Sequence, residues 1–149
     1  MCWAGSPKHQ NDKLRSIDPA QLALLAGIPN VRFYSLQKGL TIEQGRRLPS
    51  NLNLIDLGAD LKDFVETAAA MVNLDLVISV DTSMAHLAGA LAKPAWTLLP
   101  FHADWRWLLH RSDSPWYPTM RLFRQPLPHD WPTVLSQVAA ELRTMAGRS

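Results

Sequence analysis

The sequence predicts an α/β fold, a Rossmann-like parallel sheet with helices on both faces. Apolar runs of strand length alternate with stretches in which apolar residues recur at helical spacing. The chain has 149 residues, enough for one domain with a substantial core. Hydrophobic residues make up 47% of it and charged residues 19%, a composition typical of globular proteins. We therefore treat residues 1–149 as a single domain.

The first elements follow from apolar content and helix-end residues. Residues 1–4 read as a core strand, followed by a polar loop. Residues 18–25 are expected to form a helix, with Asp18 as N-cap, Pro19 at the first helical position and Gly27 beyond the end.

The middle of the chain predicts two more strands and a longer helix. The strands are residues 31–36 and 52–57, separated by a short helix or irregular segment at 40–48. A helix is expected over residues 60–71. Its inward face is predicted to carry Leu61, Phe64, Val65, Ala68 and Met71.

The most informative stretch is Leu76–Pro94, which reads as a buried strand, a polar turn and a helix. The strand, 76–80, is uniformly apolar apart from one serine, as suits a parallel strand covered on both faces. The turn Asp81–Ser83 supplies three N-cap candidates. The helix, 83–92, precedes a fifth strand at 95–99.

The remaining residues predict a loop, an edge strand and a last helix. Residues 101–118 form a Trp-rich loop with room for one helical turn, and residues 120–123 the edge strand. The helix spans residues 130–146. Its inward face is predicted to carry Val134, Leu135, Val138, Leu142 and Met145.

Alternation of strands and helices favours the strand order 3-2-1-4-5, with the sixth strand at the edge. The chain then reverses direction between strands 1 and 4, and ligands of open α/β sheets bind at such a switch point. The loops Gly5–Arg15 and Asp81–Ser83 should meet there. This places a basic loop beside a helix start whose backbone N–H groups favour an anion, typically a phosphate.

Several side chains near this point are candidates for binding. Lys13 and Arg15 could clamp a diphosphate, or belong to a solvated loop that contacts nothing. Asp81 could accept a ligand hydroxyl or only cap the helix. His86 could donate to a phosphate or simply satisfy a backbone carbonyl. Thr82 and Ser83 would present the backbone N–H groups.

Two further segments lie on the same rim of the sheet, Gln37–Gly39 at the end of one strand and Pro100–Asp104 after another. Gln37 or Glu43 could bind a ribose hydroxyl, by analogy with the acidic residue of dinucleotide folds, or Gln37 could only end its strand. The segment Asp104–Gln125 interleaves tryptophan with arginine. It could stack on a base, sugar or single-stranded nucleic acid, but an aromatic cluster that pins a long loop is the simpler interpretation.

Composition narrows the function classes. The net charge of +2 is too small to predict a nucleic-acid partner without a clustered basic face. The single cysteine, Cys2, excludes an internal disulfide and a cysteine zinc cluster, and the five histidines lack metal-site spacing, so no metal is expected. The glycine patterns of nicotinamide-binding domains and of P-loop ATPases are both absent. Without a transmembrane run or a signal peptide, a cytoplasmic protein is expected.

The same residues carry a family resemblance. The run VDTSMAHLAGALAKPAWTLLP resembles the donor-binding motif of glycosyltransferase family 9, the ADP-heptose:lipopolysaccharide heptosyltransferases. The segments WAGSPKHQNDKLRSI, SLQKG and DWRWLL…DSPWYP…RLFRQ are similar to a bacterial branch of tetratricopeptide-repeat proteins with a family-9-like transferase end. The resemblance covers nearly the whole chain.

The resemblance implies a two-domain GT-B architecture, of which this chain looks like the C-terminal, donor-binding half. Asp81, Thr82, Ser83 and His86 would hold the diphosphate and nearby sugar, with Arg15 or Lys13 as the basic partner. Gln37 or Glu43 would lie near the ribose. The chain departs from the usual heptosyltransferase pattern at Ser83, where glycine is common, so the donor could differ.

These expectations lead to one functional hypothesis and its alternatives. The chain would bind a nucleotide-diphosphate sugar, with no other cofactor, for glycosyl transfer to a saccharide or protein acceptor. No catalytic residue is assigned, because the family places the base in the N-terminal acceptor domain, which is apparently absent. Little activity is then expected of the chain alone, and Met1 could mark a truncation. The alternative is a non-catalytic module that binds a nucleotide sugar or a protein partner.

Overall fold

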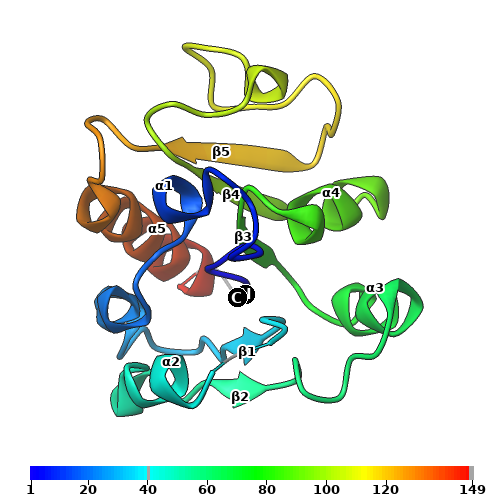
Figure 1. Cartoon of the computed structure of the whole chain (residues 1–149), viewed down its shortest axis with the longest axis vertical. Coiled ribbons are helices and arrows are strands. Elements are labelled where there is room, and N and C mark those ends of the chain that lie inside the picture. Colours follow the sequence, from blue (N-terminus) through cyan, green and yellow to red (C-terminus); the bar gives the residue numbers. More distant parts are fainter. Residues whose placement is uncertain (40, 148–149) are drawn as a thin grey trace.

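The computed structural model describes residues 1–39 and 41–147, and it has the predicted α/β architecture. Figure 1 shows the strands stacked edge to edge through the middle of the molecule, with helices on either side. Strands β3 (Val77–Val80), β4 (Ala95–Leu99) and β5 (Met120–Arg124) form a parallel sheet in the order β3-β4-β5. The last of these is the edge strand that the sequence predicts.

The first residues join this sheet to a second parallel pair, β1 (Tyr34–Ser35) and β2 (Ile55–Asp56). Cys2 pairs in parallel with Ser79, and the N–H of Leu36 donates to the carbonyl of Met1 at 2.8 Å. The order across the molecule is therefore β2, β1, residues 1–3, β3, β4, β5. This arrangement confirms the predicted order 3-2-1-4-5 with the sixth strand at the edge.

The strands predicted at residues 1–4, 31–36 and 52–57 are much shorter in the structure. Residues 1–4 make a single bridge at Cys2. Asn30, with φ 58°, precedes β1, and Asn53, with φ 50°, precedes β2. Asparagine tolerates this left-handed conformation, which ends an extended run.

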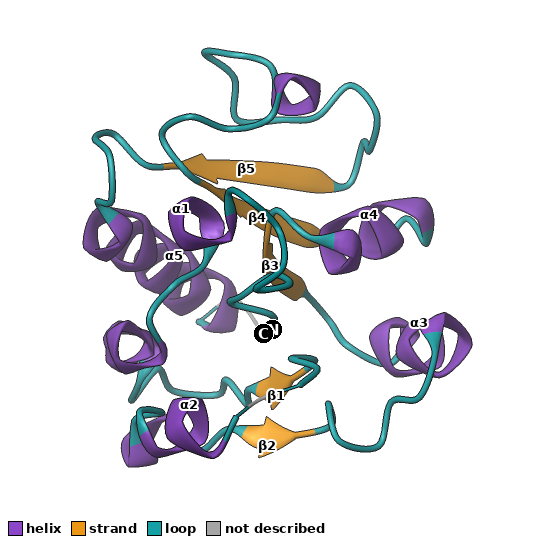
Figure 2. Cartoon of the chain, viewed as in Figure 1, coloured by secondary structure: helices purple, strands orange, loops and turns teal. Residues whose placement is uncertain are grey.

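The two faces of the sheet carry separate apolar cores, and Figure 2 shows the helices that lie on either side of the strands. Helices α3 (Phe64–Val72) and α4 (Ser83–Ala90) cover one face. The other is covered by α5 (Trp131–Ala146) and the 3-10 helix η1 (Pro19–Leu25), with α2 (Ile42–Arg46) nearby. Alternate strand residues serve the two cores: Val77 faces α4, whereas Ile78 faces α5.

The predicted helix after Asp18 is a 3-10 helix. Asp18 is the predicted N-cap and accepts from the N–H of Ala20 at 3.1 Å. Leu22 and Leu25, three residues apart, are both fully buried. The three-residue repeat of a 3-10 helix places them on one side.

Helix α3 begins at Phe64, four residues later than predicted, because Asp63 is extended and caps it. The predicted inward face is correspondingly wrong: Phe64 is 59% and Val65 76% exposed. Thr67 and Met71 are the helical residues that are buried. On α5, Met145 is also more exposed than predicted, and Ala146 is buried in its place.

The remaining elements are short. The loop Gly5–Arg15 contains one helical turn, α1 (Asp12–Arg15), that the sequence does not reveal. The predicted turn of the Trp-rich loop is the 3-10 helix η3 (Trp105–Trp107), and another, η2 (Ser50–Leu52), lies before β2. Of the helices in the described residues, none is both long and apolar enough to cross a membrane.

Candidate functional site

Two cavities open on either side of the start of α4, at the carboxyl ends of the central strands. The larger, cavity A, has a volume of about 630 Å³, and cavity B about 360 Å³. Thr82 and Ser83 line both. Both volumes lie in the range of small-molecule sites. The site therefore lies where the strand order reverses, as the sequence predicts.

The start of α4 is built by Thr82. It is extended, and its Oγ1 accepts from the N–H of Met84 at 3.3 Å. The same oxygen lies 3.1 Å from the hydroxyl of Ser79 on β3. Thr82 is thus the N-cap of α4. Asp81, for which capping was one of the two expected roles, does not cap the helix. Ser83 is the first residue of α4 and lines both cavities, and at this position the N–H has no intrahelical acceptor.

Arg15 connects the first loop to this turn. Its Nη1 donates to the main-chain carbonyl of Asp81 at 2.8 Å, and its Nε lies 3.6 Å from Asp12 Oδ1. Gly5 lies against the guanidinium of Arg15: a Cβ at residue 5 would lie 2.5 Å from Arg15 Nη2. Arg15, Asp81 and His86 all line cavity B. The two loops predicted to converge do so.

His86 lies one turn into α4 and is held by aromatic neighbours. Its Nδ1 lies 3.0 Å from the hydroxyl of Tyr117, and its ring stacks on Trp107 with centroids 5.2 Å apart. Its Nε2 lies 3.9 Å from Asp81 Oδ1. The hydrogen-bond partner of the imidazole is thus the phenol of Tyr117 and not the backbone carbonyl considered above. The other ring nitrogen, Nε2, lies beside the carboxylate of Asp81, which lines cavity B.

Gln37 lines cavity A, but its amide oxygen is already in use. Oε1 accepts from the N–H groups of Trp3, at 3.2 Å, and Ala4, at 3.0 Å, and from Cys2 Sγ at 3.3 Å. The side chain thus fastens the first residues to the end of β1. Burial raises the pKa of the Cys2 thiol, which also lines cavity A.

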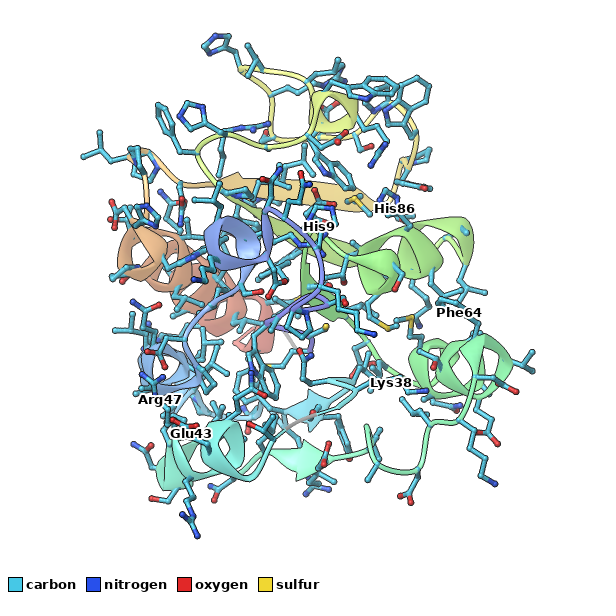
Figure 3. The ribbon with its side chains drawn as sticks, in the orientation of Figure 1. His9, Lys38, Glu43, Arg47, Phe64 and His86 are labelled. Carbon is cyan, nitrogen blue, oxygen red and sulfur yellow. The ribbon has the colours of Figure 1, made fainter. Side chains whose placement is uncertain are left out.

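Two of the sequence-predicted residues lie apart from the cavities. Lys13 is exposed on α1 and lines neither of them. Glu43 lies on α2 near Arg47, away from Lys38 and His86 (Figure 3), and also lines neither. The ligand roles of the other predicted residues stay predictions.

Sequence reasoning assigned no binding role to several lining residues. Cavity A is bordered by Lys38, Lys62 and Phe64, and cavity B by His9, His102, Asp104 and Arg106. Lys38, His102 and Asp104 belong to the segments that the sequence places on this rim, so their position was the available signal. Phe64 was assigned to the core because its spacing from Met71 fits a helical face.

The Trp-rich loop is fixed to the sheet at several points. Trp107 is buried, and Trp116 Nε1 donates to the carbonyl of Arg106 at 2.8 Å. Arg124 donates to the carbonyl of Leu108 at 2.6 Å. Trp105 is nevertheless 70% exposed. Trp107 is buried, as expected of an aromatic cluster that pins the loop, whereas Trp105 and Trp116 are mostly exposed to solvent.

Comparison with known proteins gives one distant similarity. The chain is 33% identical over 125 residues to Protein FlbA of Caulobacter vibrioides, an alignment that covers 79% of this chain. The chain spans only 20% of that relative's length. No protein-family model matches the chain, and no solved structure does.

Proposed function

We propose that this chain is the donor-binding domain of a family-9-like glycosyltransferase, and that it binds a nucleotide-diphosphate sugar at the start of α4. The convergence of Arg15, the Thr82 cap and His86 beside two ligand-sized cavities is the observation that carries the proposal. The motif resemblance noted above supports it independently. The protein would act in the cytoplasm, where nucleotide sugars are made.

The diphosphate would lie against the first turn of α4. The backbone N–H of Ser83 would donate to its oxygens, whereas that of Met84 already donates to Thr82 Oγ1. The helix dipole would favour the charge of the diphosphate. The Arg15 guanidinium lies on the cavity B side, where it would neutralise the second phosphate. Ser83 adds a side chain at the point where the family often has glycine, and its hydroxyl would donate a further hydrogen bond.

The two cavities would divide the donor. Cavity A is larger and has mainly apolar walls, which suits a nucleoside. Cavity B carries polar and charged side chains, including Asp81, His86 and Asp104, which suits a sugar rich in hydroxyl groups. In the transfer, the bond between the anomeric carbon and the diphosphate oxygen breaks, and an acceptor oxygen takes its place. Arg15 and the α4 N–H groups would stabilise the departing diphosphate.

The acceptor and the base that takes its proton would come from outside this chain. We therefore expect binding without appreciable turnover by the isolated chain. An acceptor domain or a protein partner would supply the remaining groups. Exposed apolar residues beside cavity B, Trp105 above all, also favour the second candidate, a non-catalytic module that binds a protein partner.

Calorimetric titration of the purified chain with ADP, UDP, GDP and their sugar conjugates tests the proposal. We expect saturable binding of one nucleotide, weakened at least tenfold by Arg15→Ala or Thr82→Ala. Lys13→Ala is the matched control, because Lys13 is a cation of the same loop that lines neither cavity. Failure of every nucleotide to bind, or equal loss in Lys13→Ala, would reject the proposed site.

A further inference from the structure

Phe64 lies in a position that the fold itself does not explain. It is the first residue of α3, and 59% of its surface is exposed. The buried residues of this helix are Thr67 and Met71. Unlike its neighbour Val65, Phe64 lines cavity A. In Figure 3 it lies beyond Lys38, on the side of α3 and α4. An aromatic ring left at the mouth of a cavity is available to a ligand.

The backbone that carries Phe64 is fixed in place. Asp63 caps α3 by accepting from the N–H of Glu66 at 2.8 Å, and Thr67 Oγ1 donates to the Asp63 carbonyl at 2.6 Å. Across the cavity mouth, Lys38 Nζ donates to the carbonyl of Lys62 at 2.9 Å. This bond joins the loop after β1 to the residues that lead into α3. The main chain that carries the ring is therefore held beside the cavity.

Among the described residues that line cavity A, Phe64 is the one aromatic side chain. The other apolar lining residues are Cys2, Ala4, Pro7, Leu36 and Met84, and the charged ones are Lys38, Lys62 and Asp63. The amide oxygen of Gln37 is occupied by two backbone N–H groups and the Cys2 thiol. Glu43 lies elsewhere. The strongest available interaction for a planar ring is stacking on Phe64.

We propose that Phe64 stacks on the base of the bound nucleotide and makes this site select a nucleoside diphosphate over a bare diphosphate. The inference rests on the proposed function, which places the phosphates at Thr82 and Ser83. From there, the base would extend through cavity A toward the start of α3. Stacking on an aromatic side chain tolerates every base, so Phe64 sets the affinity for a nucleoside without choosing which one.

The test compares inorganic pyrophosphate with ADP, UDP and GDP by calorimetry, using the whole chain. We expect Phe64→Ala to lower the affinity for the tightest-binding nucleoside diphosphate by roughly tenfold, which is the effect expected from the loss of one stacking contact. Its affinity for pyrophosphate should not change, and Phe64→Trp should retain nucleotide binding. Val65→Ala is the matched control, because Val65 is the adjacent residue on α3, is even more exposed and does not line the cavity.

The outcomes separate this inference from the proposed function. If Phe64→Ala binds the nucleotide as tightly as Val65→Ala does, stacking is refuted and the donor site stands. Equal weakening of pyrophosphate and nucleotide would also overturn the inference, because it would indicate a general change in the site. If the unaltered chain binds neither, the proposed function fails and this inference fails with it.

Discussion

Arg15 donates a hydrogen bond to the main-chain carbonyl of Asp81 at 2.8 Å and so ties together two loops that are 66 residues apart in the chain. This contact uses one guanidinium nitrogen and directs the group to the first turn of α4. A planar guanidinium has further donors for a second partner. Arg15 is therefore placed both to stabilise the turn and to meet an anion bound there.

Gly5→Ala should reduce pyrophosphate binding although residue 5 carries no ligand-binding side chain. A Cβ at this position would lie 2.5 Å from Arg15 Nη2 and 2.7 Å from Asp12 Oδ1, so the guanidinium must move. We expect a loss of affinity of about tenfold, the equivalent of one weakened charge-assisted contact. Calorimetry measures the affinity, and circular dichroism checks the fold. Unchanged affinity in Gly5→Ala would show that the position of Arg15 does not matter.

Gly89→Ala should destabilise the protein, although alanine is the better helix former. A Cβ at residue 89 would overlap the ring of Tyr117, which is hydrogen-bonded to His86. Overpacking of this kind costs about 1–3 kcal/mol, against about 1 kcal/mol gained in helix propensity. Urea unfolding measures the difference. The destabilisation should vanish when Tyr117→Ala is also present; if the two changes are additive, the ring is not the cause.

Gln37→Ala should lower the free energy of unfolding by about 2–4 kcal/mol, because it leaves two backbone N–H groups, those of Trp3 and Ala4, without their acceptor. Gln137→Ala, at an exposed position of α5, is the matched control and should change stability by less than about 0.5 kcal/mol. Thermal unfolding followed by circular dichroism compares them. Similar stability of the two variants would mean that the Gln37 bonds contribute little.

The Cys2 thiol should react slowly with a disulfide reagent at pH 8. Burial raises the pKa of the thiol, so less thiolate is present than in an exposed cysteine. The residue as a whole is only 5% exposed. The unfolded chain loses this proton first as pH rises past about 8.5, so the free energy of unfolding should fall above that pH. The reaction rate in native buffer and in urea measures the protection. Equal rates in the two conditions would contradict it.

The fold could be predicted well, and the reasons are local. The run of β3, apolar apart from Ser79, the helix-start residues after it and the short connections together imply parallel strands. The hydrogen bonds of Cys2 and Leu36 confirm the strand order. The length of β2 could not be predicted, because the left-handed residue Asn53 lies inside the run 52–57 and no apolar pattern marks it. The start of α3 was missed because Asp60 and Asp63 are both acceptable N-caps.

The convergence of two loops beside the start of α4 was predicted. It follows from strand order alone, so Arg15 and Thr82 could be brought together from the sequence. Periodicity misplaced Phe64, because a helical pattern does not show that this first-turn residue stays exposed. Glu43 lies on α2 and lines neither cavity, and the sequence carries no motif that fixes its place.

Backbone amide NMR of the isotope-labelled chain during titration with a nucleoside diphosphate tests the central claim most directly. The account predicts saturable shifts of the amides of Ser83 and Met84 at the start of α4, together with those of Gly5 and Phe64 around cavity A. Shifts confined to other surfaces, such as the exposed Trp105 region, or no shifts with ADP, UDP or GDP, would contradict it.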